Sequence, residues 1–377
     1  MNIKITEVKS KKDLSLFVSF ANKLYKNCDD YCPAIEFDEK NTFNTKKNPA
    51  LEFSEFCNFL AWKDGKLVGR ICALINNRAN AHWNVKKVRF GWFDFIDDYE
   101  VSSALLDAAK NWGKEKGMEI LNGPVGFTDF DHQGLLLEGF EYDSPMTSLY
   151  NFPYYVKHFE KYGLTKEADW VEYKVFIPDE IPEKMERISK IVTDRYHLKI
   201  DKVKSTKELI KKYGYTYFDV IDSTYQKLYN FQPLTQRQKE YYCKMYFPML
   251  NFDFITIITN EQDEIVGVGI GMPDISVALR KCNGKLFPFG WFSVIKSLKS
   301  KKHEVIDLML IAVREDYQNK GVNALFFHDQ LKYFHKYGVK HAESSAILEN
   351  NVKHLANWDY FETLQHKRRR AYIKPIE

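Results

Sequence analysis

Apolar positions along the chain fall into short runs separated by polar turns, and two of these patterns occur twice. Asn58–Asn76 and Phe254–Pro273 each contain two apolar runs joined by a polar turn, which predicts a β-hairpin in each half of the chain. Val101–Lys116 and Asn323–Tyr337 carry apolar residues at helical spacing, and each ends directly before a glycine. The pattern therefore predicts an α/β protein in which strands and helices alternate.

The repeated elements occur in the same order, about 200 residues apart, which indicates an internal repeat. The residues that correspond are Gly69 and Gly267, Val156–His158 and Val352–His354, and Pro178 and Pro375. We predict two tandem domains, 1–180 and 198–377, each a central mixed sheet (α+β) flanked by helices. The offsets vary, so we expect one insertion in each half, near Gly134–Pro153 and near Ile275–His303. We interpret the recurrence of Phe90–Phe93 as Phe289–Phe292, inside the second insertion, as coincidence.

The second half contains a pattern that is typical of pyrophosphate binding. The apolar strand Ile306–Val313 leads into a turn with Gln318-Asn319-Lys320-Gly321, and an apolar-faced helix begins at once. In such a turn backbone N–H groups converge, and the helix dipole adds partial positive charge. In the first half the corresponding turn, Asp97–Glu100, has no glycine and three acids, which repel a pyrophosphate. We therefore expect the first domain to be a degenerate copy that does not bind this ligand.

The turn resembles motif A of the GNAT superfamily, the acetyl-CoA-dependent N-acyltransferases. Gln318 and Gly321 match its Gln/Arg-x-x-Gly-x-Gly/Ala pattern, but Asn323 stands where the second Gly or Ala is expected. Nearly the whole chain is similar to a bacterial double-GNAT family, which shares the segments Asn48–Phe53, Gly91–Phe93, Gly123-Pro124, Gly134–Leu136, Gly139-Phe140 and Asn151–Tyr155. The resemblance implies that acetyl-CoA or another acyl-CoA is held by Ile311, Ala312, Val313, Gln318, Asn319, Lys320, Gly321, Val322, Asn323, Ala324 and Asn351.

The resemblance also implies a mechanism, direct attack of an amine on the thioester, with an N–H group near Ile311–Val313 stabilising its oxygen. A base must take the proton of the amine, and from their positions Glu343 is our candidate base and Tyr360 our candidate acid. His341 is a second candidate base. Trp358 stands where the family places its Tyr, and Trp is no proton donor to a thiolate. The plainer interpretations are a solvated face for Glu343 and core packing for Tyr360.

Composition adds limits on partners and compartment. The net charge is only +4, so we do not expect a nucleic-acid footprint. The basic run His366–Arg370 is compatible with phosphate contacts, but we expect it to guard the edge of a closing strand, Ala371–Ile376. Six scattered cysteines predict free thiols in the cytoplasm and no metal site. Because no stretch approaches the length of a membrane span, we expect no membrane partner.

The sequence thus predicts an N-acyltransferase, with acetyl transfer favoured, acting on a small-molecule or peptide amine. Two alternatives stay open, a non-catalytic acyl-CoA- or ligand-binding protein and a FemABX-like aminoacyltransferase that uses aminoacyl-tRNA. The acceptor, the acyl chain and the oligomeric state are left open.

Overall fold

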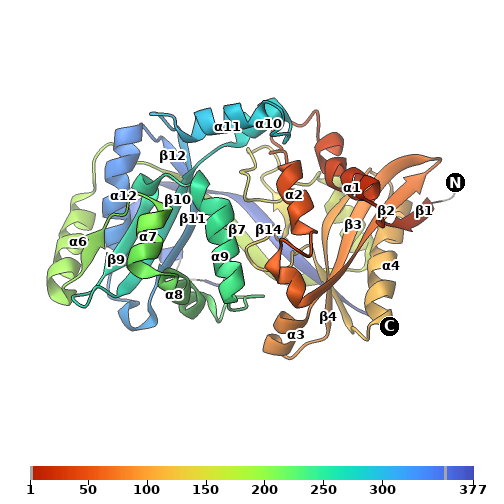
Figure 1. Cartoon of the computed structure of the whole chain (residues 1–377), viewed down its shortest axis with the longest axis horizontal. Coiled ribbons are helices and arrows are strands. Elements are labelled where there is room, and N and C mark those ends of the chain that lie inside the picture. Colours follow the sequence, from red (N-terminus) through yellow and green to blue (C-terminus); the bar gives the residue numbers. More distant parts are fainter. Residues whose placement is uncertain (1–2, 352–354) are drawn as a thin grey trace.

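One continuous sheet runs through the molecule and carries helices on both faces (Figure 1). The structure is a computed structural model and describes residues 3–351 and 355–377. The predicted repeat residues Val352–His354 lie outside the described part of the chain. The main path of the sheet has the order β1-β2-β3-β4-β5-β14-β7-β12-β11-β10-β9-β8, with β6 beside β14 and β13 beside β7.

The first half contains the elements of one repeat. Its strands are β1 (Ile3–Glu7), β2 (Ser54–Lys63), β3 (Lys66–Asn76), β4 (Lys87–Phe95), β5 (Ile120–Gly123), β6 (Leu135–Glu138) and β7 (Thr165–Phe176). Its helices are α1 (Lys11–Leu24), α2 (Glu36–Thr42), η1 (Pro49–Glu52), α3 (Asn77–Trp83), α4 (Tyr99–Glu115) and α5 (Tyr154–Tyr162). The predicted hairpin is β2–β3, and α4 is the predicted helix with its start two residues earlier.

The second half repeats the order with added helices. Its strands are β8 (Lys199–Asp201), β9 (Ile255–Thr259), β10 (Ile265–Pro273), β11 (Val305–Val313), β12 (His341–Ser344), β13 (Ile347–Leu348) and β14 (Thr363–Pro375). Its helices are α6 (Glu183–Tyr196), α7 (Thr206–Tyr213), α8 (Thr216–Tyr225), α9 (Gln236–Tyr246), η2 (Phe247–Met249), η3 (Phe252–Phe254), α10 (Ser276–Cys282), α11 (Gly290–Leu298), η4 (Glu315–Tyr317), α12 (Asn323–Tyr337) and η5 (Ala356–Tyr360). The helix α12 has the predicted bounds.

The two halves exchange their closing strands. β14, the last strand of the chain, pairs with β5 of the first half, where Tyr372 opposes Gly123. β7, the last strand of the first half, pairs with β12, where Lys174 opposes Glu343. β14 and β7 also pair with each other over most of their length. The exchange joins the halves through backbone hydrogen bonds at the centre of the sheet. The division into domains 1–180 and 198–377 stays a prediction.

Each half has its own apolar core between the sheet and its helices. In the first half Val101, Leu105 and Ala109 of α4 pack on the inner residues of β2, β3 and β4. In the second half α12 and α6 pack on one face, through Phe326 and Val192 among others. α7, α8 and α9 pack on the opposite face of the second half.

The two predicted insertions lie where the halves meet. The second forms α10 and α11, which in Figure 1 run along the top of the molecule between the halves. Phe90–Phe93 lies within β4, whereas Phe289–Phe292 covers the start of α11, so their likeness has no structural counterpart. Among the described residues, no helix is long and apolar enough to cross a membrane.

Candidate functional site

A gap in the sheet of the second half lies between the neighbouring strands β11 and β12. The two strands pair in parallel only from Val305 to Leu308. Beyond that point β11 contains a bulge, since Ile270 opposes Leu310 and the next residue of β10, Gly271, opposes Leu308. Met309 is therefore the extra residue, and a bulge bends its strand away from the neighbour. Beyond Leu308 no strand of the described chain pairs with β11 on the side of β12, so this part of β11 has a free edge.

Two of the three residues predicted on this strand present their backbone to the free edge. The carbonyl oxygen of Ile311 accepts a hydrogen bond from Tyr225 Oη (3.2 Å), and that of Val313 accepts one from Thr224 Oγ1 (3.0 Å). Both donors belong to α8. Because backbone groups alternate in direction along a strand, Ala312 points its backbone to β10, where it opposes Val268. Ile311 and Val313 are thus placed to contact a ligand in the gap, and Ala312 only supports them.

The predicted pyrophosphate turn lies at the end of this edge. Its conformation requires positive φ at Asn319 (59°) and Gly321 (78°), which favours Asn and Gly. α12 begins at Asn323 directly after the turn, and its N-cap residue, Val322, makes no side-chain capping hydrogen bond. Ala324 N–H binds the Gly321 carbonyl (3.0 Å) in the first turn of the helix. An uncapped helix start next to an exposed turn is a suitable anion site.

Side chains around the turn add one cation and fix its packing. Lys320 is exposed and its ammonium lies 5.0 Å from the ring centres of Tyr196 and Tyr317. Gln318 Nε2 donates to the Val313 carbonyl (3.1 Å), which ties the turn to β11. A Cβ on Gly321 would point at α6 and meet Val192 Cγ2 at 3.1 Å. The glycine therefore serves packing against α6 as well as the backbone angle.

The corresponding place in the first half is filled by the protein itself. Asp98 caps α4 by accepting a hydrogen bond from Glu100 N–H (3.0 Å), and it pairs with Lys63 (2.5 Å). Its carboxylate occupies the position at the helix start that a phosphate would take. On the edge of β4, the Phe90 carbonyl accepts a hydrogen bond from Val125 N–H (2.9 Å). These contacts favour the interpretation of the first half as a degenerate copy.

Two carboxyl groups lie side by side where β11 and β12 still pair. Asp307 opposes Glu343 in the parallel ladder, so both side chains leave the same face of the sheet. Asp307 is 3% exposed, and neither of its carboxyl oxygens has a hydrogen-bond partner among the described residues. Burial raises the pKa of Asp307 well above its usual range, and the neighbouring Asp274 and Glu343 raise it further. Asp307 is therefore a buried carboxylic acid next to the gap.

Glu343 has the opposite environment. Its carboxylate lies 2.7 Å from His366 Nε2 and 3.6 Å from Lys367 Nζ. Burial acts to raise the pKa of Glu343, but these two partners and His341 outweigh it and hold the pKa below its usual range. Two adjacent carboxyls with pKa values moved apart are typical of acid–base chemistry, although ion-pair networks also produce such shifts. The solvated face that we considered for Glu343 is not what the structure has, since the residue is buried.

The basic run His366–Arg370 belongs to this buried cluster, and our expectation that it guards a strand edge is wrong. β14 begins at Thr363, so the run lies inside a strand with neighbours on both sides. Arg369 pairs with Glu172, and Lys367 Nζ donates to the Asp143 carbonyl (2.7 Å). Local sequence did not indicate this because the acids that neutralise the run come from other strands. Because its side chains are paired with these partners, the run offers little charge to an external phosphate.

The candidate acid, Tyr360, lies on the other face of the sheet from Glu343. It packs at the margin of the core beneath α12, with Lys184 Nζ of α6 at 5.3 Å from its ring centre. Trp358 is buried in the same core, 6.0 Å from the ring of Phe327. Asn351 is half-buried after β13, and its carbonyl accepts a hydrogen bond from Leu355 N–H (3.1 Å). The structure does not bring Tyr360 and Glu343 together on one face.

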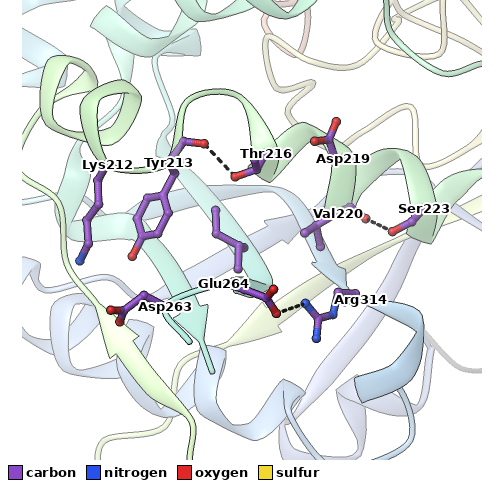
Figure 2. Close-up of a pocket in the computed structure, with 10 residues that line it drawn as sticks. Lys212, Tyr213, Thr216, Asp219, Val220, Ser223, Asp263, Glu264 and Arg314 are labelled. Atoms are coloured by element: carbon purple, nitrogen blue, oxygen red, sulfur yellow. Dashed lines mark hydrogen bonds and ion pairs between the residues drawn. The ribbon is translucent and has the colours of Figure 1, made fainter. Parts of the chain in front are cut away.

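A hollow of about 550 Å³ lies at the far end of β11, between α7, α8 and the turn from β9 to β10 (Figure 2). Both cations that line it are paired among the described residues, since Arg314 lies 3.2 Å from Glu264 and Lys212 lies 2.7 Å from Asp201. The hollow therefore offers no unpaired cation to an anionic ligand, and we assign no ligand to it.

Asp307 is the residue that our sequence reasoning missed. The available signal was a single acid in the otherwise apolar strand Ile306–Val313, because an acid in a buried strand is rare unless it is paired or functional. Our candidate base, Glu343, lies after the helix α12 rather than within the strand β11.

Comparisons with known proteins agree with the predicted fold. No family model matches the chain. It is 28% identical over 379 residues to Protein YghO of Escherichia coli (strain K12), covering 97% of this chain and 94% of that protein. It is 24% identical over 328 residues to Bacterial ceramide synthase of Caulobacter vibrioides (strain NA1000 / CB15N), covering 84% of this chain and 82% of that one.

Solved structures resemble it over its whole length. A tandem GNAT protein from the clavulanic acid biosynthesis pathway has a TM-score of 0.57 at 9% identity, covering 100% of this chain and 99% of that one. A GCN5-related N-acetyltransferase from Sphaerobacter thermophilus has a TM-score of 0.52 at 10% identity, covering 100% and 96%. The chain thus has the tandem GNAT fold, which confirms the resemblance and the fold class predicted from its sequence.

Proposed function

Because the fold is that of a tandem GNAT protein, we propose that this chain is an N-acyltransferase that moves an acyl group from acyl-CoA to an amine. One observation carries the proposal. The free edge of β11 begins just beyond Asp307, a buried carboxyl that has no hydrogen-bond partner among the described residues. It leads to the start of α12 beside Gly321, where the N-cap residue Val322 makes no capping hydrogen bond. This arrangement offers a proton acceptor near one end of the free edge and an anion site near the other.

The residues around the turn fit the phosphates of an acyl-CoA. The backbone N–H groups from Asn319 to Val322 would hold the pyrophosphate next to the start of α12, with Lys320 adding a charge. Gln318 and Ala324, whose N–H groups donate to Glu315 and Gly321, would stabilise the turn. Ile311 and Val313 would bind the arm of the ligand along the free edge, in place of their present contacts with α8. Asn351 follows β13 on the far side of the gap.

When bound, the acyl-CoA supplies an activated thioester carbonyl, whose C–S bond breaks as the C–N bond to the amine forms. Asp307 would receive the proton of the attacking amine, because it is the buried carboxyl that lacks a hydrogen-bond partner among the described residues and its pKa is raised by burial. Glu343 would keep its negative charge beside His366, and that charge would raise the pKa of Asp307. Tyr360, our candidate donor of a proton to the leaving sulfur, would act from the opposite face.

The acceptor that we propose is an amine on a long apolar chain. This part of the proposal is supported by the relative named Bacterial ceramide synthase, since a ceramide is an amide of a fatty acid with a long-chain amino alcohol.

The test is to incubate the protein with acetyl-CoA or palmitoyl-CoA and a long-chain primary amine. We expect release of free thiol with the formation of an equal amount of amide, measured by mass spectrometry. Asp307→Asn should slow the reaction about 10²-fold or more, whereas Asp194→Asn, an exposed acid on α6, should not. Tight binding of acyl-CoA without any amide product would instead favour the non-catalytic alternative.

A further inference from the structure

The second insertion carries an unusual combination of charge and exposed apolar surface. From Ile275 to His303 the chain has no Asp or Glu, and it contains seven basic residues. Six of them are exposed lysines, at positions 281, 285, 296, 299, 301 and 302. The seventh, Arg280, pairs with Asp143 of the first insertion (2.9 Å). The surface of this segment is therefore strongly cationic.

The same segment presents large apolar side chains to solvent. Six of the thirteen large hydrophobic residues that are exposed in the described chain belong to it, namely Val277, Phe287, Phe289, Trp291, Phe292 and Ile295. Phe287, Phe289 and Phe292 are 69%, 79% and 65% exposed. The ring of Phe37, also exposed, lies 6.1 Å from that of Phe287 and extends the patch onto α2. We call these seven residues the aromatic patch.

The patch is held by an anchored pair of helices. Ile275 and Leu279 of the α10 region and Val294 of α11 are buried in one cluster with Cys32 of the first half. The turn between the helices is fixed as well, since Trp291 Nε1 donates to the Pro288 carbonyl (3.0 Å). The buried residues of α10 and α11 thus hold the segment on the rest of the protein. No described residue covers its opposite, exposed face, which carries the aromatic patch.

We propose that the aromatic patch and its lysines form a docking surface for an anionic lipid bilayer. Aromatic side chains insert at the level of the headgroups, and lysines around them are attracted to anionic lipids. Charge argues against a second copy of the chain as the occupant. A two-fold interface brings the same patch of both subunits together, and here it would oppose lysines to lysines with no acid of the segment between them.

The position of the docking surface suits the proposed function, but the docking proposal does not depend on that function. Asp274, which directly precedes the segment, is one of the groups that raise the pKa of Asp307, so the docking surface begins next to the candidate site. A lipid-bound amine would therefore reach the protein on the side of its site. The proposal replaces our expectation of no membrane partner, which considered only segments that span a bilayer. Interfacial helices lie on the membrane and need no such length.

The test uses the full chain and vesicles of phosphatidylcholine, alone or mixed equally with phosphatidylglycerol, in a sedimentation assay. We expect binding to the mixed vesicles that falls steeply between 0.1 and 0.5 M NaCl, and little binding to phosphatidylcholine. The double variants Phe289→Ser with Phe292→Ser, and Lys296→Glu with Lys299→Glu, should each weaken binding about tenfold or more. Each changes only exposed residues, so folding should be unaffected.

Matched controls lie elsewhere on the surface. Ile191→Ser removes an apolar side chain that is 53% exposed on α6, and Lys207→Glu with Lys211→Glu reverses two exposed lysines on α7. Both should bind vesicles like the wild type. Equal binding by the patch variants, or no binding by the wild type, would overturn the proposal. So would a stable dimer of the wild type, found by analytical ultracentrifugation, that the patch variants convert to monomer.

Discussion

The buried carboxyl of Asp307 makes a prediction about stability that is independent of any substrate. Because burial raises its pKa in the folded chain, Asp307 stays protonated at pH values where the unfolded chain has already ionised it. Unfolding then releases a proton. The free energy of unfolding must therefore fall as pH rises from the unfolded pKa, about 3.9, up to the folded pKa.

The magnitude follows from linkage. Each pH unit in that window should lower the free energy of unfolding of the wild type by about 1.4 kcal/mol. Asp307→Asn keeps the shape of the side chain and cannot ionise, so it lacks this penalty. The stability of the variant relative to the wild type should rise with pH by the same slope.

The assay is urea unfolding followed by tryptophan fluorescence at pH 5, 6 and 7, with the m-value compared at each pH. Asp194→Asn on α6, where the acid is exposed, is the control and should show no such slope. A difference between Asp307→Asn and the wild type that does not change with pH would show that Asp307 ionises normally. It would also remove the base that we propose.

Three further predictions follow from the same geometry. Lys320→Glu should weaken acyl-CoA binding by about tenfold or more in calorimetry, whereas Lys332→Glu, twelve residues further along and exposed on α12, should not. Glu343→Gln removes a negative neighbour that raises the pKa of Asp307, so the acidic limb of the pH–rate profile should move to lower pH. An acidic limb that stays in place would show that Glu343 does not influence the pKa of Asp307. The fragment 198–377 should aggregate alone, because it lacks β7 between β12 and β14, and become soluble when co-expressed with 1–197; a soluble monomer would show that the strand exchange is dispensable.

Much of the fold was predictable because it is recorded in local patterns. The hairpins β2–β3 and β9–β10 and the helix α12 follow from apolar spacing and turn residues, and their repetition predicts the tandem fold. The exchange of β7 and β14 was not predictable in this way. A strand pattern specifies which face is buried, but it does not specify which neighbour completes the ladder.

The candidate site shows the same division. The turn with Gln318 and Gly321 is a local signal, and the structure has it as an exposed turn that leads into α12. The charged cluster depends on contacts between strands that are distant in sequence, such as Asp307 beside Glu343 and Glu172 beside Arg369. For that reason the sequence suggested a charged edge at His366–Arg370, where the structure has a buried ion-pair network.

The central claim, that acyl-CoA binds at the second half only, is tested most directly by hydrogen exchange of the whole chain with and without coenzyme A, read by mass spectrometry. The account predicts that the ligand slows exchange of backbone amides in peptides that cover 309–324, the free edge of β11 and the turn before α12. Peptides that cover 95–103, where Asp98 caps α4, should exchange at an unchanged rate. Protection of 95–103, or no protection of 309–324 at saturating ligand, would contradict the account.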